Sequence, residues 1–125
     1  MKTLRKVTVL WLDRQHAYLH VFLDGGIQEV KKFVAHHTDH HTHVRDAFDT
    51  QREESSFFRD LAKGLEGADK VLILGPGMAK HHLRSYLTEQ WPMVARRIDR
   101  LESSDHPTEA QIAALARSYF EKALA

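Results

Sequence analysis

Histidine is concentrated in one segment of the chain. Five of the ten histidines lie between residues 36 and 43, and Arg45 follows them. Neutral imidazole is the commonest side-chain ligand for zinc and related metals. Spacings of three and two residues within the segment could bring two ring nitrogens to one ion. The five are His36, His37, His40, His41 and His43.

This histidine cluster (residues 36–43) has three interpretations. The first is a metal site formed by His37, His40, His41 and His43, although neighbouring histidines on one loop more often bind zinc or nickel adventitiously. The second is a solvated loop that responds to pH, because imidazole gains a proton at about pH 6.5. The third is a contact surface for phosphate or RNA, which would include Arg45. We expect no resident cofactor.

A second candidate site follows the most apolar run of the chain. Residues 71–80 read VLILGPGMAK, which predicts a buried strand, a glycine turn and the start of a helix. A helix that begins at the carboxyl end of a parallel strand offers free backbone N–H groups to an anion. Gly77, Lys80 and Arg84 could therefore bind phosphate. The alternative is a tight turn followed by an ordinary exposed helix face.

Nothing in the sequence favours covalent catalysis. Cysteine is absent, and no serine stands in a G-x-S-x-G motif. Asp13 and the pair Asp105-His106 fall at predicted strand or turn ends and could act as acid or base, although loop carboxylates more often cap turns. We therefore expect a protein that is not an enzyme.

The composition of the chain narrows the class of protein further. The chain has 125 residues, 18 basic and 17 acidic side chains, and a net charge of +1. Its balanced charge does not by itself mark a nucleic-acid binder. No apolar run approaches the length of about 20 residues that a membrane span requires. We expect one domain over residues 1–125, located in the cytoplasm.

Hydrophobic patterning predicts the elements that must position these residues. Three strands joined by short turns should form an antiparallel meander, and a polar loop follows at His36–Glu54. Alternating helices and strands then form a parallel half. The expected strands are 6–13, 17–23, 27–35, 71–74 and 94–101, and the expected helices are 55–65, 79–90 and one that begins at the capping box Thr108-x-x-Gln111. The fold class is thus α/β, with a mixed five-stranded sheet in three layers.

The sequence resembles the central domain of the eukaryotic and archaeal peptide-chain release factor and of Pelota, the ribosome-rescue factor, in the small stand-alone bacterial form described as a translational machinery protein. The main match is Val71–Lys80, where the family has an apolar strand, Gly-Pro-Gly and a lysine. Asp13 in the first strand and Gln51–Glu54 ahead of Phe57 support it. The resemblance covers nearly the whole chain and implies a ribonuclease-H-like fold that acts at or near the ribosome.

One departure from the family limits what the resemblance implies. Release factors carry Gly-Gly-Gln in the loop after the third strand, whereas residues 36–54 contain no such motif. Peptide release therefore does not carry over. We expect a non-catalytic protein that contacts the ribosome, rRNA or tRNA through the histidine cluster. The alternatives are a metal-binding protein or metal-dependent hydrolase that uses the same histidines, or a homo-oligomer with Trp91, Tyr119 or Phe120 at its interface.

Overall fold

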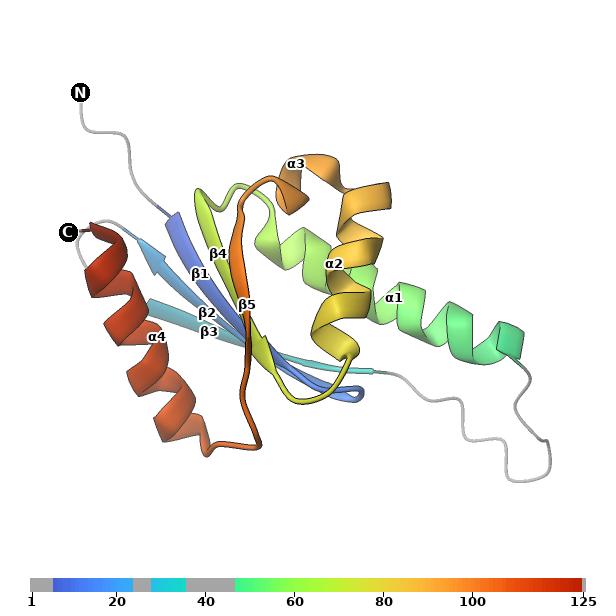
Figure 1. The fold of residues 1–125 in the computed structure, drawn as a ribbon, viewed down its shortest axis with the longest axis horizontal. Coiled ribbons are helices and arrows are strands. Elements are labelled where there is room, and N and C mark those ends of the chain that lie inside the picture. Colours follow the sequence, from blue (N-terminus) through green and yellow to red (C-terminus); the bar gives the residue numbers. More distant parts are fainter. Residues whose placement is uncertain (1–5, 24–27, 36–46, 125) are drawn as a thin grey trace.

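The computed structural model describes residues 6–23, 28–35 and 47–124 (Figure 1). Within that part of the chain, a meander of three strands precedes an alternation of helices and strands. The elements are β1 (Lys6–Leu12), β2 (His16–Leu23), β3 (Gln28–Val34), α1 (Ala47–Leu65), β4 (Lys70–Gly75), α2 (Ala79–Gln90), α3 (Pro92–Ala95), β5 (Ile98–Ser103) and α4 (Glu109–Leu124).

The five strands form one mixed sheet in the order β3-β2-β1-β4-β5. β1 pairs antiparallel with β2 and parallel with β4, so the direction of pairing changes at β1. Leu10 faces Leu19 of β2 on one side and Ile73 of β4 on the other, and all three are fully buried. The predicted meander and parallel half are therefore both confirmed.

Helices cover both faces of the sheet, which gives three layers (Figure 1). Because side chains alternate across a strand, each face has its own apolar set. One face packs against α1 and α2 through residues such as Leu61 and Leu83. The other packs against α4, where the Phe22 and Phe120 rings stack with centroids 4.8 Å apart. The predicted three-layer α/β fold with a mixed five-stranded sheet is confirmed.

Two predicted boundaries are wrong. Helix α1 begins at Ala47, so the loop does not extend to Glu54. Residues 51–54 read Gln-Arg-Glu-Glu, all good helix formers, which accounts for the earlier start. The predicted fifth strand also starts too early, because Pro92 opens the short helix α3 and its last turn continues to Ala95.

His20 is a polar side chain inside the sheet. It lies on β2 opposite Val9 and is only 3% exposed. The side-chain amide of Gln28 on β3 lies 3.0 Å from its Nδ1. Burial lowers the pKa of His20 from its ordinary value of 6.5, and the carboxylate of Glu109 on α4 opposes part of that effect. The folded protein therefore favours the neutral imidazole.

We predict that His20 makes the fold less stable in mild acid. Because its pKa is lower in the folded than in the unfolded state, the unfolded chain binds the extra proton first. Stability should then fall as pH drops below 6.5 and level off below the folded pKa. Urea unfolding at pH 7.5 and 5.5 should show a smaller drop for His20→Gln than for the original chain. His81→Gln, at a half-buried position on α2 with no carboxylate partner among the described residues, is the control, and equal drops in both variants would contradict the prediction.

Candidate functional site

The candidate site lies at the edge of the sheet where β1, β4 and β5 have their carboxyl ends. The amide of Ser104, just after β5, donates a hydrogen bond of 3.1 Å to the Gly75 carbonyl at the end of β4. β3 ends at the same edge, since the Ala35 amide donates to the carbonyl of Gln15 in the turn after β1. This edge, which we call the carboxyl edge, is where doubly wound α/β sheets place their ligands.

The Gly75-Pro76-Gly77 turn is shaped by close backbone approach. Gly75 has a φ of +155°, and a Cβ built there would lie 2.0 Å from the carbonyl oxygen of Leu12. Gly77 has a φ of +59°, in the left-handed region, and is exposed. The sequence predicted glycines for a tight turn. The contact between Gly75 and β1 explains why only glycine fits at the first position.

Lys80 lies beneath this turn. Its side chain is 3% exposed, and Nζ donates a 2.7 Å hydrogen bond to the Gly77 carbonyl. The ammonium therefore ties the first turn of α2 to the preceding loop. Lys80 stabilises the conformation of the turn directly, and a role as an anion ligand stays a prediction.

The remaining cationic groups of α2 are on its outer side. Arg84 and His82 are exposed, and His81 is half-buried. His82 Nδ1 lies 3.8 Å from a carboxylate oxygen of Glu54 on α1, a distance at which the imidazole forms an ion pair when protonated. Met78 is the N-cap residue of α2, and its side chain accepts no hydrogen bond from the first backbone N–H groups of the helix.

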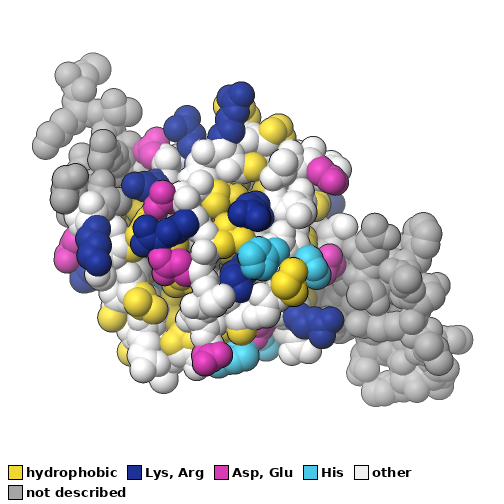
Figure 2. Space-filling view, viewed as in Figure 1, with side chains coloured by type: hydrophobic (Ala, Val, Ile, Leu, Met, Phe, Trp, Pro, Cys, Tyr) yellow, Lys and Arg dark blue, Asp and Glu magenta, His cyan; other side chains and the backbone are white. Residues whose placement is uncertain are grey.

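Figure 2 shows the molecular face that carries α2. Histidine, lysine and arginine side chains are scattered over it among a smaller number of acidic groups. The face that carries α2 is therefore mildly basic.

A second group of side chains meets at the carboxyl edge. Asp13, after β1, accepts backbone hydrogen bonds of 2.8 and 2.7 Å from Gln15 and His16. Its other oxygen lies 3.5 Å from Nε2 of His106, which follows β5. The Trp11 indole N–H donates to the Asp105 carbonyl at 3.1 Å, and its ring meets the His106 ring edge-on. These contacts hold the segment after β5 against β1.

The sequence offers Asp13 and His106 as separate candidates for an acid or base and does not predict that they meet. No local pattern relates two residues so far apart along the chain. Their positions at the ends of two strands that point the same way are the one signal that could have paired them. Among the described residues, no group of three or more histidine, aspartate or glutamate side chains is arranged to hold a metal ion.

The histidine cluster and Arg45 lie outside the described residues. The predicted site residues that the structure does describe are Gly77, Lys80 and Arg84, and all three lie in the turn after β4 or in the first turns of α2.

Of the three aromatic residues predicted for an oligomer interface, Tyr119 and Phe120 are buried against the sheet. None of the described helices combines the length and apolar character needed to cross a membrane.

Comparison with curated proteins finds a partial likeness to Pelota. The chain is 34% identical over 56 residues to the Pelota homologue of Thermococcus gammatolerans, a match that covers 40% of this chain and 16% of the relative. The homologue of Thermococcus kodakarensis matches at 32% identity over the same length. No protein-family model matches the sequence.

Solved structures extend the likeness over most of the chain. Pelota from Archaeoglobus fulgidus superposes with a TM-score of 0.61 at 16% identity, over 90% of this chain and 31% of that one. The archaeal translation termination factor aRF1 gives 0.59 at 16% identity, over 94% and 39%. The protein has the α/β fold of a Pelota-like or release-factor-like central domain. It corresponds to less than two-fifths of either solved chain and to about a sixth of the curated relatives.

Proposed function

We propose that the protein acts in translation by contacting the ribosome, rRNA or tRNA, without catalysing peptide release. The observation that carries the proposal is the fold, which is shared with Pelota and with a translation termination factor over nine-tenths of this chain. The absence of Gly-Gly-Gln from residues 36–54 separates it from peptide-releasing factors. A protein of this kind works in the cytoplasm.

The contact surface of the proposal is the carboxyl edge. Gly77 and Arg84 are exposed there, and Lys80 holds the turn on which Gly77 sits. Backbone N–H groups at a helix start and arginine side chains are common partners of nucleic-acid phosphates. The proposed set is completed by His36, His37, His40, His41, His43 and Arg45, whose imidazoles and guanidinium suit the same chemistry.

Co-sedimentation with ribosomes at several salt concentrations tests the proposal. We expect the bound fraction to fall as salt rises, because phosphate contacts release counterions. Arg84→Gln should weaken binding and reduce the slope of log K against log salt by about 1. Arg117→Gln, an exposed arginine on α4 at the other face of the sheet, should leave both unchanged. No association even at low salt would refute ribosome contact.

The alternative is a metal-binding protein or metal-dependent hydrolase that uses His37, His40, His41 and His43. The close spacing of these imidazoles in the sequence favours it. Metal analysis of protein purified without an affinity tag separates the two functions. A stoichiometric ion that is lost when the four histidines are replaced by glutamine would favour the alternative. Protein that is free of metal yet binds ribosomes would exclude it.

A further inference from the structure

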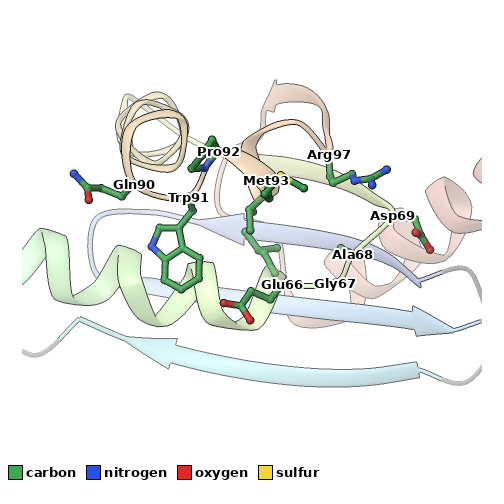
Figure 3. Close-up of a pocket in the computed structure, with 11 residues that line it drawn as sticks. Glu66, Gly67, Ala68, Asp69, Gln90, Trp91, Pro92, Met93 and Arg97 are labelled. Atoms are coloured by element: carbon green, nitrogen blue, oxygen red, sulfur yellow. The ribbon is translucent and has the colours of Figure 1, made fainter.

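A pocket lies at the opposite edge of the sheet from the carboxyl edge. It has a volume of about 460 Å³, within the range of small-ligand sites, and opens between the end of α1 and the corner that joins α2 to α3 (Figure 3). Leu65, Ala68 and Val94 are buried residues of its lining. Neither the fold nor the proposed ribosome contact requires a hollow here.

Trp91 and Met93 form part of the pocket wall. Trp91 is half-buried, and its indole N–H lies 3.4 Å from the Tyr86 hydroxyl, which fixes the ring. Met93 is 64% exposed, so its side chain is accessible to a bound group. Methionine adapts its shape to a partner. An apolar stem can therefore pack between Met93 and the pocket floor.

The charges of the lining are unevenly placed. Figure 3 shows the Glu66 carboxylate turned towards the Trp91 side, whereas Arg97 and Asp69 lie at the other end. Asp69 accepts a 2.8 Å hydrogen bond from the Lys6 amide, and the Lys6 ammonium donates to the Glu66 carbonyl rather than to its carboxylate. Among the described residues, the Glu66 carboxylate forms no ion pair.

These features favour a positively charged ligand. Glu66 follows directly after the last residue of α1, where the helix dipole is negative. The face of an indole ring attracts a cation, and arginine is the residue that most often stacks on it. The carboxylate can pair with two guanidinium N–H groups at once. Charge and shape thus favour a planar cation on an aliphatic stem.

We propose that this pocket binds an arginine side chain presented by a protein partner, with the guanidinium between Trp91 and Glu66 and the stem against Met93. The site is independent of the proposed RNA contact, which lies at the other edge of the sheet. It gives the molecule a protein-binding surface and a nucleic-acid-binding surface on opposite sides.

Titration of ¹⁵N-labelled protein with the peptide acetyl-Gly-Arg-Gly-amide tests the proposal. The Trp91 indole signal, distinguished from that of Trp11 by a Trp91→Phe variant, should shift with a Kd on the order of 1 mM. The citrulline peptide, which has the same shape without the charge, should bind at least about fivefold more weakly. Equal binding of the two peptides, or no shift of the indole at a concentration of about 10 mM, would overturn the proposal.

The matched variants are Glu66→Gln and Glu89→Gln. Both residues are exposed, so neither change should disturb the fold, and well-dispersed spectra check this. Glu66→Gln should raise the Kd of the arginine peptide about fivefold. Glu89→Gln, on α2 outside the pocket lining, should leave that Kd unchanged. Unchanged affinity in Glu66→Gln would refute the role of the carboxylate. A tetranucleotide that shifts the Trp91 indole where the peptide does not would make this an RNA site and refute the proposal.

Discussion

Gly75→Ala should destabilise the protein by at least about 3 kcal/mol and leave little folded protein at 37 °C. The added Cβ would lie 2.0 Å from the Leu12 carbonyl oxygen, a contact that only a backbone shift can relieve. The φ of +155° is also one that residues with a side chain rarely adopt. Moving Gly75 away from Leu12 disturbs the pairing of β1 with β4 at the centre of the sheet.

Gly77→Ala is the matched control two residues away. Its φ of +59° is left-handed, but a Cβ there would have no heavy atom within 4 Å. The cost should therefore be limited to backbone strain, about 1 to 2 kcal/mol. Urea unfolding followed by circular dichroism measures both variants. If Gly75→Ala proves as stable as Gly77→Ala, the close approach to Leu12 does not shape the turn.

Local patterns were sufficient to predict the layers of this fold. Helical spacing predicts the inner side of α1, and all five residues of that side are buried, namely Phe57, Phe58, Leu61, Ala62 and Leu65. The capping box was confirmed in both directions. The Thr108 amide donates to Gln111 Oε1 at 2.9 Å, and the Gln111 amide donates to Thr108 Oγ1 at 3.1 Å. Such signals depend on residues within one turn of each other, so a single sequence contains them.

The candidate site was less predictable because its contacts join distant parts of the chain. The meeting of Asp13 with His106 depends on the register of three strands and on the path of the segment after β5. The burial of Lys80 depends on how the turn after β4 folds over α2. Lysine is also almost never fully buried, so a general expectation of exposure fails here. The pocket at Trp91 is formed by two corners that follow different helices, and no sequence motif marks it.

Helix α4 shows how one position in a predicted stripe can differ from its neighbours. Helical spacing predicts that five apolar residues face inward, namely Ile112, Leu115, Ala116, Tyr119 and Phe120. Leu115 is 48% exposed, whereas the other four are buried. On a helical wheel, Leu115 lies at one margin of the stripe, so a single helix on an open sheet face leaves it at the rim. Burial by a neighbouring layer, rather than periodicity alone, decides which apolar residues carry stability.

Phe120→Ala should therefore destabilise the protein by about 3 to 5 kcal/mol, while Leu115→Ala should cost less than about 1 kcal/mol. The Phe120 ring is 5% exposed and stacks on Phe22 at 4.8 Å, so its removal leaves a cavity between α4 and the sheet. α4 is the one helix that covers this face within the described residues, and nothing else there can close the gap. Parallel urea titrations measure both variants. Similar losses of stability in the two would mean that α4 is not held to the sheet by Phe120.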